Sequence, residues 1–409
     1  MSAQAIPTPK AAAKAPTYAW VILAVVYLAS VAAPLNQFKV PPVMPLLIQA
    51  FNLSLGSAGI LMSIFSITGF LLALPAGFIL QRFGPKITGL IAVGAVVVGS
   101  VLGALSNTSA LMLASRFIEG AGMGLIMVVA PAAIAMWFPA ETRGTPMGLW
   151  ATCVGIGGII MYNLAPALAA LFSWRAVWWA GAAFALVAFV LFGALFRMPK
   201  QEEAAGGRSS GKAEAGREKP PSLGKAIANR SLWLLSLEFL CFNVVVLAFS
   251  TYYPTFLNGV RNYTLAGASF MASLATIFAI LATPLGGYMS DRIGSRKLLI
   301  VIPFILTALT FLFPFSVTGW MIPGLMIVMG TLTGPVAPAT FATVPEVMVL
   351  PQLAGYGMAV LALGQNLGMF IGPVMFGQLV ESMGWTAAGY LMIPVCAIGI
   401  IAGWLVKVR

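Results

Sequence analysis

The sequence predicts an all-α integral membrane protein with twelve transmembrane helices arranged as two similar six-helix bundles. Three observations predict this fold class. Of the 409 residues, 60% are hydrophobic and 8% are charged, and the mean hydropathy is +0.98, whereas a soluble domain has roughly 25% charged residues. Twelve stretches reach the length of about 20 predominantly apolar residues that a spanning helix needs. Patterns of the first half also recur in the second half at a nearly constant spacing.

The predicted spans are separated by short polar segments. In order, they cover residues 18–44, 57–80, 87–105, 109–138, 146–171, 176–196, 232–256, 265–290, 298–317, 320–344, 353–379 and 385–406. Residues 197–231 are rich in Gly, Ser, Pro and mixed charges, which predicts a flexible cytoplasmic linker. The expected division is a tail at 1–17, a six-helix bundle at 18–196, this linker, a second bundle at 232–406 and a C-terminus at 407–409. The first span is too long for a signal-peptide core of about 7–15 residues, so we expect it to be retained.

The basic residues predict the orientation in the membrane. All but four of the 22 Lys and Arg fall on one side of the membrane when both termini are cytoplasmic. The exceptions are Arg175 and Arg261, in loops of the other side, and Lys39 and Arg116, within spans. Because cytoplasmic loops carry the excess of basic residues, we expect an inner-membrane protein with both termini in the cytoplasm. The net charge of +12 therefore reflects topology, and no nucleic-acid partner is expected.

Composition excludes several classes of chemistry. Histidine is absent, which excludes His-based metal sites and Ser-His-Asp triads. Cys153, Cys241 and Cys396 lie in apolar spans without paired spacing, so neither a disulfide framework nor a zinc site is expected. Residues 206–212 match GxxxxGK, but Ala213 replaces the Ser or Thr that would bind Mg²⁺ and no strand precedes the motif. We therefore expect no enzyme activity, no metal and no cofactor.

Three patterns repeat between the two halves. The segment LPAGFILQRFGPK around Gly77 recurs as PLGGYMSDRIGSRK around Gly287, APAAIAMWFP recurs as APATFATVPE, and SWRAVWWAG is echoed by GWTAAGYLM. The offsets lie between 207 and 211 residues. A constant offset at three separate places indicates two structurally similar halves with a pathway between them.

These motifs resemble those of the major facilitator superfamily, and the resemblance covers the chain from residue 18 to residue 406. The family's loop motif, GxxxDRxGxRK in loose form, is matched in the first half by Gly77, Arg82, Gly84 and Lys86, with Gln81 in place of the usual Asp. The second-half copy is complete, with Gly287, Asp291, Arg292, Gly294, Arg296 and Lys297. The fourth-span pattern RxxxGxGxG is matched by Arg116, Gly120, Gly122 and Gly124.

The resemblance implies a transporter that works by alternating access, with its substrate bound between the halves. It also implies that the two loop motifs form a conformational latch that holds the outward-open state. Because Gln81 removes one charge, we expect the first-half latch to be weaker than the latch that contains Asp291. The alternative is a basic loop that only sets the orientation. The glycines of the fourth span are expected to allow close helix packing.

Charged residues within spans are the main candidates for function, because a charge at membrane depth costs at least about 2.5 kcal/mol. Lys39 shares a helix face with Asn36 and precedes Pro41 and Pro42, which should loosen the helix. Its ammonium group would suit a carboxylate or another small anion. A basic residue before a proline in the first span also resembles organic-anion members of the superfamily, including the anion:cation symporter and cyanate-transporter-like groups. The alternative is that Lys39 extends to the outer interface.

The other buried charges are candidates for proton coupling. Arg116 and Glu119 lie three residues apart and can pair along one helix face, either as a structural ion pair or as part of a coupling route. Glu238 has no partner in its own helix and is a candidate proton carrier; alternatively, it pairs with Lys225 or Arg230 at the cytoplasmic rim. The resemblance implies that spans one, five, seven and eleven line the cavity, so their polar residues are further candidates for substrate binding: Gln37, Tyr162, Asn163, Asn243, Tyr252, Gln365 and Asn366.

The sequence thus predicts a secondary transporter of a small organic anion in the lipid bilayer, coupled to protons or another ion and functional as a monomer. Two alternatives remain open. One is a proton-driven exporter of drug-like or amphipathic metabolites, favoured if the cavity is mostly aromatic and Lys39 faces the headgroups. The other is a membrane sensor that binds a ligand without moving it, which transport against a gradient would exclude.

Overall fold

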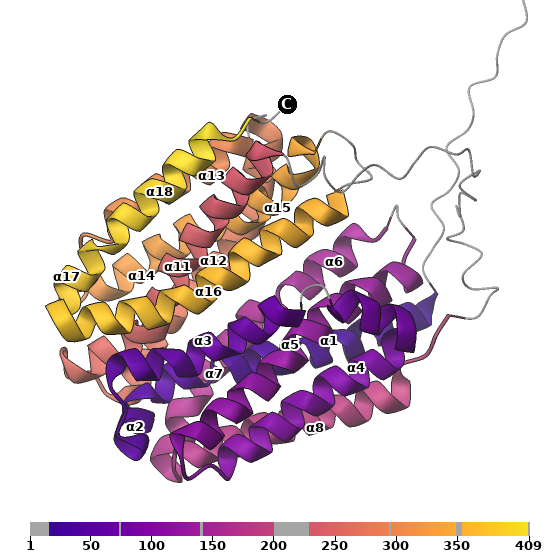
Figure 1. The fold of residues 1–409 in the computed structure, drawn as a ribbon, viewed down its shortest axis with the longest axis horizontal. Coiled ribbons are helices and arrows are strands. Elements are labelled where there is room, and N and C mark those ends of the chain that lie inside the picture. The colour runs from indigo at the N-terminus through magenta and orange to yellow at the C-terminus, as the bar shows by residue number, and fades with distance from the viewer. Residues whose placement is uncertain are drawn as a thin grey trace, which may run out of the picture.

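The structure is a computed structural model that describes residues 16–72, 75–139, 142–199, 229–293, 296–348 and 354–407. Side chains are described for all of these except residues 285–293, 296, 299, 354 and 355. The described chain is helical and contains no strand, and its two halves lie side by side, the first drawn from indigo to pink and the second from red to yellow (Figure 1). The predicted fold class is therefore confirmed.

The first half forms six spans from helices that are partly broken. Its helices are α1 (Thr17–Gln37), α2 (Val40–Phe51), α3 (Leu55–Leu72), α4 (Pro75–Ala104), α5 (Ser109–Trp137), α6 (Gly144–Ala151), α7 (Cys153–Leu171) and α8 (Trp174–Leu195). The first span consists of α1 and α2, and the fifth consists of α6 and α7. Helix α4 holds the end of the second span and the whole third span, which meet at Gly84 with φ 74° and ψ 168°. This left-handed backbone explains the glycine of the loop motif at that position.

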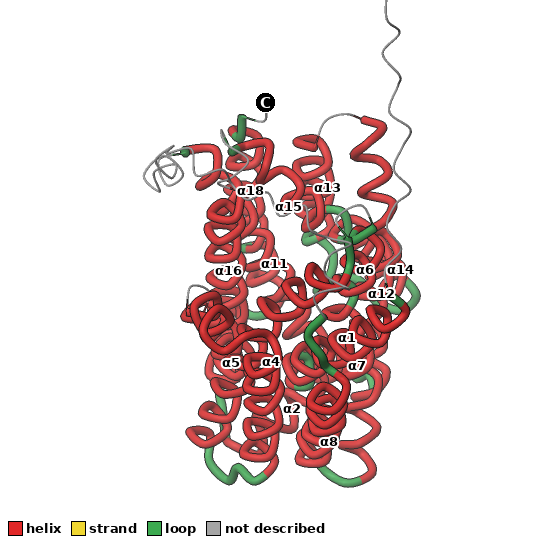
Figure 2. Tube along the Cα trace, turned by 90° about the vertical axis from the view of Figure 1, so that its right-hand side faces the viewer, coloured by secondary structure: helices red, strands yellow, loops and turns green. Residues whose placement is uncertain are grey.

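The second half repeats the six-span arrangement. Its described helices are α11 (Arg230–Gly259), α12 (Leu265–Ile293), α13 (Arg296–Thr310), α14 (Met321–Thr333), α15 (Val336–Val347), α16 (Ala354–Met383), α17 (Trp385–Tyr390) and α18 (Met392–Leu405). The tenth span is divided into α14 and α15, and the twelfth into α17 and α18. The helices run roughly along one direction and their loops gather at two ends (Figure 2). We call the end with residues 196–199 and 229 the linker end, and the end with the turns at 52–54, 105–108 and 260–264 the far end.

The ninth span differs from the prediction. Eleven described stretches are long and apolar enough to cross a membrane, whereas α13 contributes a shorter apolar helix, Ile300–Thr310. The sequence predicted a continuous span at 298–317, but the helix ends at Thr310 and turns follow. Pro314 cannot donate a helical hydrogen bond, and Gly319 adopts a left-handed φ of 60°, so both residues favour these turns over a helix.

The two halves are joined by hydrogen bonds toward the far end. Helix α3 packs along α16, and α7 packs along α12. The Gly56 amide of α3 donates to Glu381 Oε1 of α16 over 3.0 Å. The Tyr252 hydroxyl of α11 donates to the Leu55 carbonyl over 2.5 Å. A Glu381 carboxylate at the positive N-terminus of α3 is electrostatically favourable, so these contacts hold the halves together at the far end.

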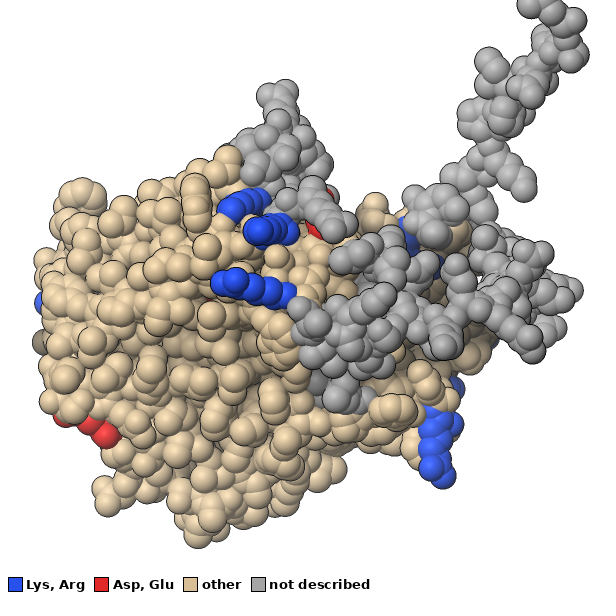
Figure 3. All heavy atoms as spheres, turned by 45° about the horizontal axis from the view of Figure 1, so that its top comes forward, with Lys and Arg blue, Asp and Glu red and all other residues tan. Residues whose placement is uncertain are grey.

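The described residues give a partial view of the predicted latch. Arg82 lies 5.7 Å from the ring centroid of Phe83 and, like Lys86, forms no ion pair with another described residue. Gly294 lies outside the described residues, as do the side chains of Asp291, Arg292 and Arg296 and the surroundings of Gly287. The relative strength of the two latches therefore stays a prediction. In the view of Figure 3, few charged side chains lie on the surface that the described residues form, as expected for helices that contact lipid.

The fourth-span glycines allow close helix packing, as predicted. A methyl group at Gly120 would overlap the Phe65 carbonyl oxygen of α3, and one at Gly122 would overlap the Ala92 carbonyl oxygen of α4. A methyl group at Gly124 would lie 3.3 Å from the Gly69 Cα. Three neighbouring positions of α5 thus pack directly on the backbones of α3 and α4, which fixes α5 in the centre of the first half.

We expect Gly122→Ala to destabilise the protein by about 1–3 kcal/mol, because the added methyl group must displace the backbone of α4. The measurement is the midpoint of thermal unfolding of the purified protein in detergent. Gly148→Ala is the matched control, since a Cβ at Gly148 meets no atom within 4 Å. Equal midpoints for the two variants would contradict the packing account.

Candidate functional site

The first span is broken where its polar residues lie. Helix α1 ends at Gln37 and α2 begins at Val40. Pro41 has no N–H, so it cannot donate a helical hydrogen bond to the Gln37 carbonyl. Arg116 of α5 supplies the donors instead: its guanidinium donates to the Asn36 carbonyl over 2.6 Å and to the Gln37 carbonyl over 3.1 Å. The arginine thereby satisfies backbone groups that the broken helix leaves unpaired.

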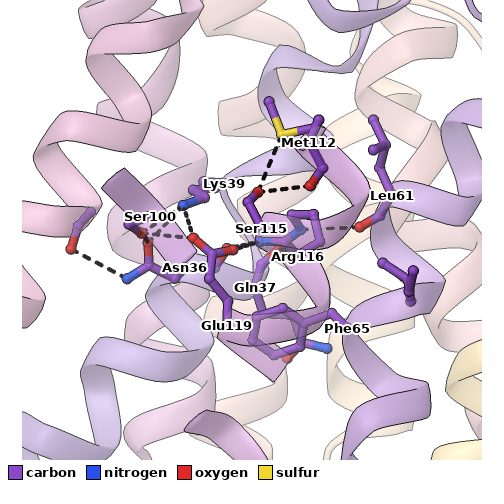
Figure 4. A network of polar contacts seen from close by, with 12 residues as sticks. Asn36, Gln37, Lys39, Leu61, Phe65, Ser100, Met112, Ser115, Arg116 and Glu119 are labelled. Atoms are coloured by element: carbon purple, nitrogen blue, oxygen red, sulfur yellow. Dashed lines mark hydrogen bonds and ion pairs between the residues drawn. The ribbon is translucent and has the colours of Figure 1, made fainter. Parts of the chain in front are cut away.

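Glu119 lies between two cations at this break (Figure 4). Lys39 Nζ lies 2.5 Å from Glu119 Oε1, and Arg116 Nη1 lies 2.5 Å from Glu119 Oε2. Lys39 also donates to Asn36 Oδ1 over 2.8 Å, and the Ser100 hydroxyl lies 2.7 Å from Glu119 Oε1. The pairing expected for Arg116 and Glu119 is confirmed, and Lys39 joins it from another span.

The cluster of Lys39, Arg116 and Glu119 is fully enclosed, with each residue 0% exposed. Lys39 Nζ lies 4.6 Å from the ring centroid of Trp178, and the Arg116 guanidinium lies 4.6 Å from that of Phe65. These ring faces stabilise the cations. The alternative that Lys39 extends to the membrane interface is therefore wrong.

With Lys39 and Arg116 protonated and Glu119 ionised, the enclosed cluster carries an excess of positive charge. Two cations share one carboxylate, and no second carboxylate contacts either cation among the described residues. In the low-dielectric interior of a membrane protein, one uncompensated charge attracts a counter-charge strongly. An anion that approaches the broken first span would therefore be stabilised.

Glu238 occupies a different buried position, in the second half. It lies on α11 with 0% exposure. The Thr340 hydroxyl of α15 lies 3.4 Å from its Oε2, but it also donates to the Val336 carbonyl over the shorter distance of 2.9 Å. Its Oε1 has no hydrogen-bond partner among the described residues. Glu238 forms no ion pair with the exposed Arg230, so that rim pairing is wrong. Lys225 lies outside the described residues, so its pairing with Glu238 stays a prediction.

A cavity of about 260 Å³ lies between the two halves. Phe38 and α7 line it from the first half, and α11, α12, α13, α14 and α16 line it from the second. Its described lining contains nonpolar and uncharged polar side chains but no charged side chain. Of the residues predicted for substrate binding, Asn243 and Gln365 line this cavity.

The remaining predicted polar residues lie elsewhere. Tyr162 donates to the Ser250 carbonyl across the halves over 2.6 Å, and Tyr252 donates to the Leu55 carbonyl. Asn366 faces Gly69 of α3, again between the halves. Asn163 is exposed and donates to its own helix at Ile159. Gln37 is buried beside the cluster, and its Oε1 has no partner among the described residues.

Sequence reasoning missed four residues of these sites. Ser100 and Trp178 complete the charged cluster, and Thr276 and Thr340 contribute to the cavity and to the surroundings of Glu238. The available signal was weak, because each is a single polar or aromatic residue in an apolar span, where most such residues serve packing.

A cavity between two similar helical bundles, with buried charges at a broken helix, is the arrangement of a secondary transporter. The chain belongs to the Major Facilitator Superfamily, whose profile matches residues 26–348 and 262–409. The resemblance seen in the sequence is thus confirmed, and the chain is a multi-pass membrane transporter and not an enzyme.

Similar proteins include transporters named for organic anions. The chain is 22% identical over 380 residues to the "Probable sulfoacetate transporter SauU" of Cupriavidus necator, covering 89% of this chain and 87% of that protein. It is 23% identical over 387 residues to the "Hexuronate transporter" of Bacillus subtilis, covering 91% and 90%. A solved structure of a bacterial homolog to the human lysosomal transporter Spinster, in an inward-facing and unoccupied conformation, has a TM-score of 0.79 at 17% identity and covers 96% of both chains. This structural likeness supports the fold.

We expect Glu119→Gln to lower the thermal unfolding midpoint in detergent strongly, because removing one partner of a buried ion pair costs about 3–5 kcal/mol. Lys39→Met should cost less, since Arg116 and Glu119 stay paired. Adding Lys39→Met to Glu119→Gln should recover part of the loss, because one unpaired cation is removed. If Glu119→Gln unfolds at the midpoint of the parent, the shared carboxylate does not stabilise the first half.

Proposed function

We propose that this protein is a secondary transporter that moves a small organic anion by alternating access and couples the movement to protons. The observation that carries the proposal is the enclosed cluster in which Lys39 and Arg116 share Glu119, because its excess positive charge favours an anionic cargo. The names of the similar proteins support an organic anion as cargo. The protein is proposed to work as a monomer in the inner membrane with both termini in the cytoplasm, in line with the distribution of its basic residues.

The proposed division of roles follows from the contacts of each group. Lys39, with Asn36 and Gln37 at the helix break, supplies the attraction for the anion, while Asn243 and Gln365 lie in the cavity that receives it. Glu238 is the proposed proton carrier, because no described cation stabilises its charge and protonation removes an unpaired buried charge. Glu119 suits this role less well, since two cations already stabilise its carboxylate, and Arg116 acts by positioning.

Export of amphipathic metabolites is the second candidate. The mostly nonpolar cavity lining favours it, but the burial of Lys39 away from the headgroups argues against it. A sensor that binds without transport is the candidate of another class. The main proposal predicts that a small organic anion accumulates across a bilayer, whereas neither of these two candidates does.

We expect liposomes that contain the parent protein, but not protein-free liposomes, to accumulate an anion from a panel of benzenesulfonate, sulfoacetate, glucuronate and galactarate under a pH gradient. Lys39→Met should lose this accumulation while keeping most of its thermal stability, because the Arg116–Glu119 pair stays balanced. Lys39→Arg, which keeps the charge, should retain part of it. Glu238→Gln should abolish the substrate-dependent pH change in the lumen. No accumulation of any panel member, with either direction of the gradient, would refute the proposed function.

A further inference from the structure

Some polar groups of the cavity between the halves have their donors bonded within the protein, and others have unbonded donors. Thr307 and Thr333 donate their hydroxyl protons to carbonyls of their own helices, at Pro303 over 2.8 Å and at Met329 over 2.9 Å. A hydroxyl has one proton to donate, so these two groups offer acceptors to a bound molecule. Asn243 donates one of its two amide protons to the Phe239 carbonyl over 2.7 Å, so it offers one donor and its carbonyl acceptor.

Two other lining side chains keep all of their donors free. Thr276 of α12 and Gln365 of α16 line the cavity, and neither forms a hydrogen bond or an ion pair with another described residue. An ionised acid group accepts hydrogen bonds and donates none. Thr276 and Gln365 are therefore the lining groups best suited to hold an anionic head.

Most of the remaining cavity wall is nonpolar. Phe38, Phe249 and Phe311 contribute aromatic rings, and Phe249 packs edge-to-face on Phe311 with centroids 5.6 Å apart. Met329 and Met369 add flexible apolar surface. Substrate hydroxyl groups facing this wall would lose their water without gaining a partner, which disfavours binding. The volume of about 260 Å³ also lies below the roughly 300–1,000 Å³ of sites for drug-sized ligands.

We propose that the cavity selects a monovalent organic anion with a compact, mostly nonpolar body, whose acid group is held by Thr276 and Gln365. This inference rests on the proposed function and narrows its substrate class. The mostly nonpolar wall disfavours a polyhydroxylated sugar acid, because it offers few acceptors for the hydroxyl groups, and the size of the cavity disfavours a large amphipathic drug. The cavity wall itself is uncharged, so the attraction for the anion comes from the excess positive charge of the cluster of Lys39, Arg116 and Glu119. Lys39 directly follows the lining residue Phe38 in the chain.

The test is uptake by liposomes that contain the full-length protein, with benzenesulfonate and butanesulfonate as nonpolar monoanions and glucuronate and galactarate as sugar acids. Sulfonates stay ionised, so they do not leak through the bilayer as neutral acids do, and protein-free liposomes give the background. We expect uptake of the sulfonates that an excess of either sugar acid does not inhibit. Uptake of the sugar acids without the sulfonates would overturn this inference and leave the proposed function standing. Uptake of neither group would refute both.

Variants test the two proposed ligands. Gln365→Leu and Thr276→Val should each raise the benzenesulfonate concentration needed for half-maximal uptake by about 10- to 100-fold, which is the effect of losing one hydrogen bond to a charged group. Thr331→Val is the matched control, because Thr331 is exposed on α14 and donates to its own helix at Ile327. The unfolding midpoint of each variant is measured alongside. Parent-like uptake by well-folded Gln365→Leu and Thr276→Val would overturn the assignment of the ligands.

Discussion

The carboxylate of Glu119 is the group on which the first half of this transporter depends. It lies 2.5 Å from Lys39 and 2.5 Å from Arg116, and so links the first span to the fourth. Arg116 in turn satisfies the carbonyls of Asn36 and Gln37 that the broken first span leaves without helical donors. The break, the buried lysine and the arginine are therefore parts of one arrangement: prolines open the helix, the arginine pairs with the opened backbone, and the carboxylate makes two buried cations tolerable. With Lys39 and Arg116 both protonated, the single Glu119 carboxylate leaves one positive charge without a counter-charge.

The two halves share a fold and differ in their chemistry. At the repeat offset of 207 to 211 residues, the positions that correspond to Lys39 fall at 246–250, where the second half has Val, Leu, Ala, Phe and Ser. Four of these five residues line the cavity. The second half thus presents a mostly nonpolar wall where the first half encloses its charges, and it carries its own buried carboxyl, Glu238, outside the cavity lining. In the proposed cycle, attraction of the anion belongs to the first half, while selection of its body and exchange of the proton belong to the second. The far-end contacts of Glu381 and Tyr252 with α3 hold the two halves together on one side of the cavity.

Sequence reasoning predicted the architecture and the identity of the buried charges, because both follow from local properties. Long apolar runs predict spans, and a charge within such a run is exceptional enough to mark Lys39, Arg116, Glu119 and Glu238 individually. The pairing of Arg116 with Glu119 was also predictable, since three residues separate them on one helix. The contact of Lys39 with Glu119 was not, because it depends on how two distant spans pack, and the interface position considered for Lys39 proved wrong. Thr276 was missed for a similar reason: a hydroxyl in an apolar span becomes notable only when the structure shows that it has no partner. The ninth span was overestimated because apolar composition continues through turns that Pro314 and Gly319 favour.

The central claim is that Glu119 is ionised and holds both cations. Infrared difference spectra between the parent protein and Glu119→Gln, recorded in lipid at neutral pH, test this claim most directly. The account predicts that the substitution removes absorption in the stretching region of ionised carboxylates. Loss of absorption in the region of protonated carboxyl groups would contradict it, because a neutral Glu119 could not balance either cation.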